Sequence, residues 1–112
     1  MKLLFIILNK EEYLHEILPI MAELNITGAT IIDSEGLAHA LAYDVPIFAG
    51  LRKMVGGTKK HNKTIFTIID DDKVLSELHE ILKEEGINFE KRGMGVMFTV
   101  PVSEVIKKSI EE

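Results

Sequence analysis

The sequence predicts an α+β domain with the element order βαββαβ, in which a four-stranded antiparallel sheet carries two helices on one face. The first observation behind this prediction is an internal repeat at an offset of 61 residues, which aligns Phe5 with Phe66 and Leu14 with Leu75. The second is that each half contains an apolar run, then apolar residues at helical spacing, then a further extended apolar segment. Right-handed crossovers in both halves place the two helices on the same face of one sheet, the arrangement called ferredoxin-like.

Each expected element has its own local signal. The four expected strands are Lys2–Leu8, Ala29–Asp33, Thr64–Asp70 and Gly95–Pro101. The two helix faces are formed by Leu14, Ile17, Leu18, Met21 and Leu24 in the first half and by Val74, Leu75, Leu78, Ile81 and Leu82 in the second. We expect Asn9 to cap the first helix, with Glu12 completing an approximate capping box, and Gly86 to end the second helix. Pro19 weakens the case for a continuous first helix, because it lacks a backbone N–H.

The strand Lys2–Leu8 is apolar on both of its faces. Leu4, Ile6 and Leu8 alternate with Leu3, Phe5 and Ile7. Because the helices cover only one face of the sheet, something else must cover the other. We expect that cover to come from other copies of the chain, packed sheet against sheet in an oligomer.

Length and composition set the broad class. A chain of 112 residues supports one domain, 1–112, and small domains gain stability by association. The absence of cysteine excludes disulfides, thiolate nucleophiles and cysteine-based zinc sites. The longest unbroken apolar run, Leu3–Leu8, is far shorter than the roughly 20 residues of a membrane span. We expect a soluble, cytoplasmic protein, and the net charge of −5 argues against nucleic-acid binding.

The two halves are joined by a long segment, 34–63, where a few residues would suffice. Its stretch from Gly50 to Lys63 holds five bases and no acid, which suggests a local anion but is typical of a solvated loop. Asp44 and Pro46 resemble the start of a short helix and Gly56-Gly57 its end. On that helix Phe48, Leu51 and Val55 share one face, with Arg52 and Lys53 beside them. This face either packs on the oligomer itself or binds a partner.

Two glycine-containing segments are candidate ligand contacts. The first segment stands just before the last strand and consists of Lys91, Arg92, Gly93, Met94 and Gly95. Its two cations can contact phosphate, and its glycines let the backbone approach a ligand closely. The second segment, Thr27–Thr30, lies between the first helix and the second strand. Taken alone, both patterns favour an ordinary turn over a ligand site.

Catalytic and metal-binding residues are not indicated. The serines lie outside any Gly-x-Ser-x-Gly motif. Asp70-Asp71-Asp72 stands at a strand-to-helix transition, where the three carboxylates suit the helix start better than acid–base or magnesium chemistry. The four histidines, His15, His39, His61 and His79, form no His-x-x-x-His pair. The sequence therefore predicts neither an enzyme nor a metal site.

Several segments, in this order and spacing, resemble the PII nitrogen-regulatory signalling family. Ile26–Asp33 followed by Gly36 is similar to that family's second strand, and Gly93–Ile106 is similar to its B-loop, last strand and C-terminal helix. The resemblance covers both βαβ units and excludes the central loop. It implies a homotrimer that binds ATP, ADP or AMP as a regulatory ligand between subunits and needs no other cofactor. It also implies that the 34–63 loop regulates a partner protein, with a membrane transporter as one candidate by analogy.

The resemblance also assigns roles to individual residues. It implies that Thr30 and Gly36 contact the base, that Gly93 and Gly95 offer backbone amides to phosphate, and that Lys107 replaces a family arginine. Val96 and Ser109 stand where the family has a phosphate-binding lysine and arginine. Their loss implies weaker triphosphate binding, unless Lys91, Arg92 or Lys108 compensates. The family's uridylylated tyrosine and its 2-oxoglutarate-binding glutamine have no match, so the chain resembles a divergent, PII-like member.

A second interpretation stays open. The same βαββαβ plan suits a sensory module that binds an amino acid or a divalent metal ion. The class of ligand distinguishes the two interpretations, because only the first predicts binding of an adenine nucleotide.

Overall fold

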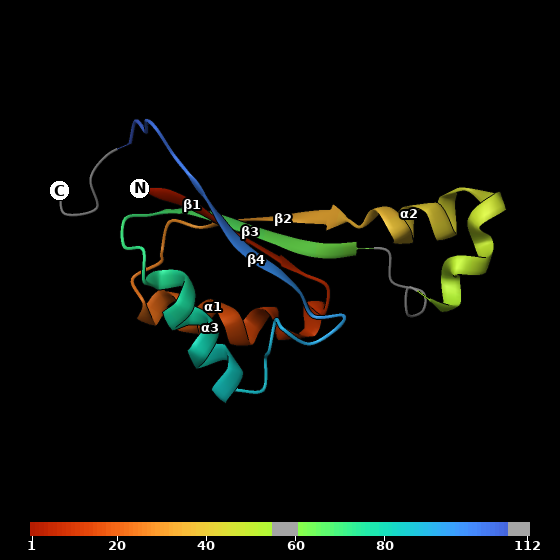
Figure 1. Ribbon diagram of the computed structural model, residues 1–112, viewed down its shortest axis with the longest axis horizontal. Coiled ribbons are helices and arrows are strands. Elements are labelled where there is room, and N and C mark those ends of the chain that lie inside the picture. Colours follow the sequence, from red (N-terminus) through yellow and green to blue (C-terminus); the bar gives the residue numbers. More distant parts are fainter. Residues whose placement is uncertain (55–60, 108–112) are drawn as a thin grey trace.

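The computed structural model describes residues 1–54 and 61–107, and it contains four strands joined by helices (Figure 1). The strands β1 (Lys2–Leu8), β2 (Thr30–Glu35), β3 (His61–Ile69) and β4 (Gly95–Pro101) form one sheet in the order β2-β3-β1-β4. Every neighbouring pair is antiparallel, with Phe5 opposite both Phe66 and Phe98. The predicted fold class is confirmed, although β2 and β3 begin and end a few residues from their expected bounds.

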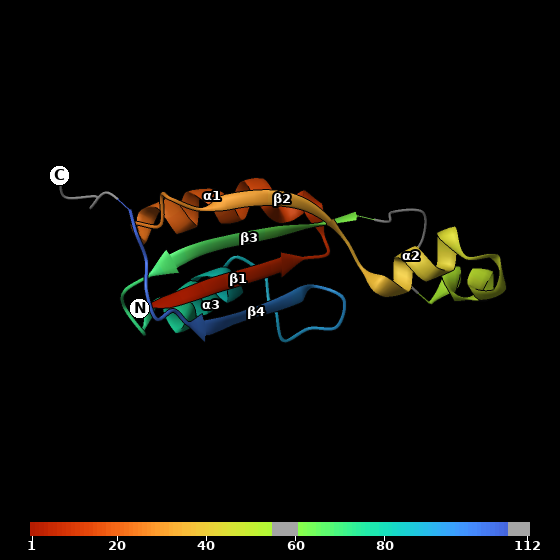
Figure 2. The same cartoon turned by 90° about the horizontal axis from the view of Figure 1, so that it is seen from above.

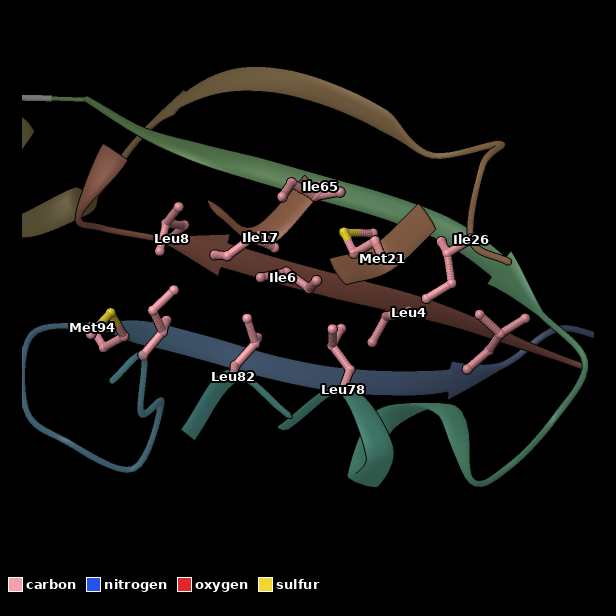
Figure 3. Close-up of a cluster of buried hydrophobic side chains, with 12 residues drawn as sticks. Leu4, Ile6, Leu8, Ile17, Met21, Ile26, Ile65, Leu78, Leu82 and Met94 are labelled. Carbon is pink, nitrogen blue, oxygen red and sulfur yellow. The ribbon is translucent and has the colours of Figure 1, made fainter. Parts of the chain in front are cut away.

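Two helices, α1 (Leu14–Glu23) and α3 (Val74–Glu84), cover the same face of the sheet (Figures 1 and 2). The alternation in β1 decides which side chains they bury, since Leu4, Ile6 and Leu8 are fully buried. These three meet buried residues of both helices and of β3, namely Ile17, Met21, Ile65, Leu78 and Leu82 (Figure 3). None of the described helices is both long enough and apolar enough to cross a lipid bilayer.

The helix ends differ in part from expectation. Asn9 does not cap a helix: the first turn is a short 3₁₀ segment, η1 (Glu11–Tyr13), which starts from Lys10 without a side-chain cap. The side chain of Asn9 instead accepts a hydrogen bond from Asn62, so a tertiary contact replaces the local cap. Pro19 lies within a continuous α1. Gly86 follows the end of α3 with φ +84°, a left-handed conformation suited to glycine, as predicted.

The linker between the halves forms a helical arm. We define the arm as residues 37–60; its described part holds α2 (Leu37–Asp44) and the 3₁₀ helix η2 (Pro46–Lys53). Figure 1 shows this part extending from the end of the sheet, away from α1 and α3. The helix predicted to begin near Pro46 corresponds to η2, whereas α2 was not predicted. Its sequence, LAHALAYD, is rich in alanine and leucine, the residues with the highest helix propensity.

The second face of the sheet is not covered by any described segment, as the view in Figure 2 shows. We call it the open face. At its centre the ring of Phe5 stacks on Phe98 at 5.1 Å between ring centroids and lies 6.0 Å from Phe66. The side chains of Ile32, Val96 and Val100 on the open face are 37–46% exposed. An apolar sheet face of this kind calls for a partner surface, so the expected association of several copies stays a prediction.

Candidate functional site

The turn before β4 is held by its own backbone and by Asn88. The Asn88 side chain accepts a hydrogen bond from the Glu90 N–H at 2.9 Å, and the Asn88 carbonyl accepts one from the Lys91 N–H at 3.1 Å. At the other end the Asn9 N–H donates to the Met94 carbonyl at 2.9 Å. In the described part of the chain the backbone N–H groups of Arg92 and Gly93 have no acceptor. With the exposed side chains of Lys91 and Arg92 beside them, these amides could bind an anion.

A charged cluster fixes this turn to α3. His79 Nε2 lies 3.0 Å from Glu90 Oε1, and Lys83 Nζ lies 3.6 Å from the same oxygen. The hydrogen bond from His79 and the charge of Lys83 lower the pKa of Glu90. Because the pKa is lowered in the folded state, the stabilisation is present above the ordinary glutamate pKa and is lost as the pH falls through the depressed value.

The variant His79→Ala should raise the pKa of Glu90 towards its ordinary value, since it removes the hydrogen-bond donor that is the largest cause of the shift. Carboxyl ¹³C NMR titration of Glu90 measures this directly. The matched control is Lys2→Gln, which removes the ion pair between Lys2 and Asp72, 3.4 Å apart and outside the cluster. An equal Glu90 pKa in His79→Ala and wild type would contradict the contact between His79 and Glu90.

Two residues of the predicted anion site have structural roles. The side chain of Met94 is 4% exposed and packs in the core, so only its backbone remains at the turn. Gly95 lies in the β1–β4 ladder opposite Leu8, and a Cβ placed on it would come within 1.9 Å of the Ile7 carbonyl oxygen. Glycine at 95 is therefore required by strand packing whether or not a ligand binds. Substitution of Lys91 or Arg92 tests the site more cleanly than substitution of either glycine.

A polar network lies at the base of the arm. Ser34 Oγ donates to Asn62 Oδ1 and lies 2.7 Å from Thr64 Oγ1, while Asn62 Nδ2 donates to Asn9 Oδ1 at 3.1 Å. Asn62 and Thr64 are 9% and 8% exposed. Gly36 follows β2 directly and caps α2 with φ −75°, and a Cβ there would meet Asn62 only at van der Waals distance. Packing within one subunit thus does not demand glycine at 36.

The residues predicted to bind the base and those predicted to bind phosphate lie at opposite edges of the sheet. Thr30 and Gly36 belong to the β2 edge, whereas the turn 91–94 and Gly95, the first residue of β4, belong to the other edge. Three strand spacings separate these edges, or about 14 Å. Lys107 follows the end of β4 that is remote from Gly95. One subunit therefore unites Lys91, Arg92 and Gly93 but does not bring Thr30, Gly36 or Lys107 to them.

Four of the predicted partner-binding residues, Phe48, Leu51, Arg52 and Lys53, lie on η2. Phe48 is 42% exposed, whereas Leu51 is partly buried. Arg52 faces α2: its Nε donates to the Ala42 carbonyl at 2.9 Å, and its guanidinium carbon lies 4.9 Å from the centroid of the Tyr43 ring. The side chain of Lys53 and all of Val55, Gly56 and Gly57 lie outside the described residues. Ile47 and Met54, which were not predicted as partner-binding residues, are 84% and 79% exposed.

A cavity of about 410 Å³, also missed, lies between α3 and β4. Leu75, Phe89 and Met97 give it apolar walls, and His79 and Glu90 are among its polar lining. It was not foreseen because its lining comes from three separate segments. Among residues 1–54 and 61–107, no three His, Asp or Glu side chains are grouped closely enough to hold a metal ion.

Comparison with known proteins shows similarity at the level of structure. No family model matches the sequence, and no curated sequence is similar to it. Among solved structures, the chain resembles Arabidopsis thaliana PII bound to citrate, with a TM-score of 0.61 and 19% sequence identity. The match covers 95% of this chain and 80% of that protein. The fold is PII-like. At this level of identity the similarity concerns the fold, and the PII-like fold places an arm between two βαβ units whose outer edges carry the candidate ligand residues.

Proposed function

We propose that the chain is a PII-like signal-transduction protein, which binds an adenine nucleotide between the subunits of a homotrimer and regulates a partner protein through its 34–63 loop. The observation that carries this proposal is the placement of the candidate ligand residues at the two outer edges of a PII-like sheet. Thr30 and Gly36 on the β2 edge can meet Lys91, Arg92 and Gly93 of the β4 edge only when the edges belong to different subunits.

Two further features support an intersubunit site. The open face supplies an apolar surface for association, centred on Phe5. Gly36 has neither a left-handed φ nor a crowded Cβ position, so its glycine is explained if a ligand or a second subunit approaches closely. The regulatory step is then a shift between arm conformations, which requires the nucleotide to bind one conformation more tightly than the other.

Calorimetric titration with ATP, ADP, AMP and cyclic adenine nucleotides tests the proposal, with the oligomeric mass measured on the same sample. We expect binding of one of these nucleotides at one site per subunit of a trimer. A folded trimer that binds none of them would contradict the nucleotide assignment.

The double variant Lys91→Ala with Arg92→Ala should weaken nucleotide binding by about 10- to 100-fold, because one or more charge-assisted hydrogen bonds to phosphate are lost. Both side chains are exposed, so folding should be unaffected. Lys10→Ala, an exposed base outside the turn, is the matched control and should bind as wild type does. Unchanged affinity in the double variant would remove the turn from the site.

A second candidate function is favoured by the cavity between α3 and β4. It lies within one subunit and has mostly apolar walls, which suits a ferredoxin-like sensory module for a small molecule such as an amino acid. Titration with apolar amino acids distinguishes the two functions. Leu75→Trp, which fills the cavity, should abolish that binding and leave nucleotide binding intact.

A further inference from the structure

Charge is divided unequally between the arm and the rest of the chain. Residues 37–60 contain four bases and one acid, a net charge of +3. The remaining residues carry a net charge of −8, which gives the chain its total of −5. We call the chain outside residues 37–60 the body. Its acids are spread over strands, helices and turns, and include Asp70-Asp71-Asp72 and Glu84-Glu85. An anionic surface would therefore attract the arm and repel the body, which gives the approaching molecule a preferred orientation.

The end of the arm also exposes large apolar side chains. Ile47 and Met54 are 84% and 79% exposed, and Phe48 is 42% exposed. Figure 1 shows η2 at the end of the molecule furthest from α1 and α3. The described part of the chain leaves Ile47 and Met54 largely uncovered and Phe48 partly so, and their place at the end of the molecule lets a broad surface reach them.

Arg52 helps to present this apolar group. Its bond to the Ala42 carbonyl and its contact with the Tyr43 ring hold η2 against α2. The neighbouring Leu51 is partly buried, whereas the side chains of Ile47 and Met54 are largely exposed to solvent. The described end of the arm thus combines a positive charge with an outward apolar group, the combination that binds at the boundary between lipid headgroups and acyl chains.

We propose that the end of the arm binds directly to an anionic phospholipid bilayer, with Ile47, Phe48 and Met54 inserted among the headgroups. The charge division favours lipid over a protein groove, because an anionic bilayer acts over a broad area, attracting the net positive arm and repelling the acidic remainder of the chain. One short apolar group binds weakly, and several arms in one oligomer would act together to strengthen the attachment. This proposal does not depend on nucleotide binding.

Vesicle co-sedimentation of the full chain tests the proposal. Vesicles of phosphatidylcholine alone are compared with vesicles containing phosphatidylglycerol, without nucleotide. We expect at least tenfold stronger partition onto the anionic vesicles. Raising the salt from about 0.1 M to about 1 M, which shortens the Debye length from about 10 Å to about 3 Å, should remove most of the binding. Absence of binding to anionic vesicles, or equal binding to both kinds, would overturn the proposal.

Paired variants locate the contact. The double variant Ile47→Ser with Met54→Ser, and separately Lys53→Glu, should each lower partition onto anionic vesicles about tenfold or more. The controls are Val105→Ser with Ile106→Ser, which removes exposed apolar side chains from the body, and Lys10→Glu, which changes the net charge equally. An equal loss in the controls would show attraction unrelated to the arm and would contradict the proposal.

Insertion itself can be followed by fluorescence. The chain contains no tryptophan, so Phe48→Trp provides a single probe at the end of the arm. A blue shift of its emission with anionic vesicles is the expected result. Emission that stays at the wavelength of exposed tryptophan while the protein co-sediments would exclude insertion of η2.

Discussion

Replacing Gly95 with alanine should lower the free energy of unfolding by about 3–5 kcal/mol, the largest effect expected of alanine at any glycine in the described part of the chain. The added Cβ would lie 1.9 Å from the Ile7 carbonyl oxygen and 3.0 Å from the carbonyl carbon. These are backbone atoms of the central strand β1, so the clash can be relieved only by separating β1 from β4. The φ of +138° adds strain for any L side chain. Urea denaturation at a fixed protein concentration measures the loss.

Gly28→Ala is the matched control for this prediction. Gly28 has no heavy atom within 4 Å of its Cβ position and no left-handed φ. Its replacement should change the free energy of unfolding by no more than about 0.5 kcal/mol. Equal stability of the two variants would mean that β4 does not approach β1 as described.

Phe98→Glu should convert the predicted oligomer into single subunits. Phe98 lies on the open face, stacks on Phe5 and is 37% exposed in one subunit. A carboxylate there would be buried without a partner if a second sheet packed on this face, and that cost exceeds what a small interface can supply. The folded single subunit keeps the residue partly in water, so the variant should remain folded. Light scattering should give a mass near 12.6 kDa for the variant and a multiple of it for wild type.

Val105→Glu places the same charge at a residue that is 39% exposed but lies beyond β4. Its mass should equal that of the wild type. A single-subunit mass for the wild type itself would contradict association through the open face, and so would an oligomeric Phe98→Glu.

The sequence was sufficient for the sheet because each half repeats the same pattern. The alternation around Phe5 and Phe66 and the helical spacing around Ile17 and Leu78 are local signals. Tertiary packing agrees with them, because the apolar residues that form these patterns are the ones that make up the core. The fate of Asn9 could not be predicted in this way. Its side chain accepts a hydrogen bond from Asn62 and does not cap the helix. Asn62 is 53 residues away in sequence and becomes a neighbour only after the sheet forms.

The candidate site was predicted less completely for the same reason. Arg92 and Gly93 could be placed in one turn from sequence, because they are adjacent. The anchoring of that turn by His79 and Lys83, and the cavity beside them, depend on how α3 lies against β4. The α2 helix is a different kind of omission, since its run of alanine and leucine was present in the sequence and was interpreted as loop.

Asn9 takes part in two contacts that link separate parts of the subunit. Its backbone N–H holds Met94 at the end of the turn before β4, and its side chain holds Asn62, which binds Ser34 at the base of the arm. One residue thus joins the turn before β4 to the base of the arm through a continuous series of hydrogen bonds. Removing the Asn9 side chain would break this series while leaving the backbone bond to Met94 in place.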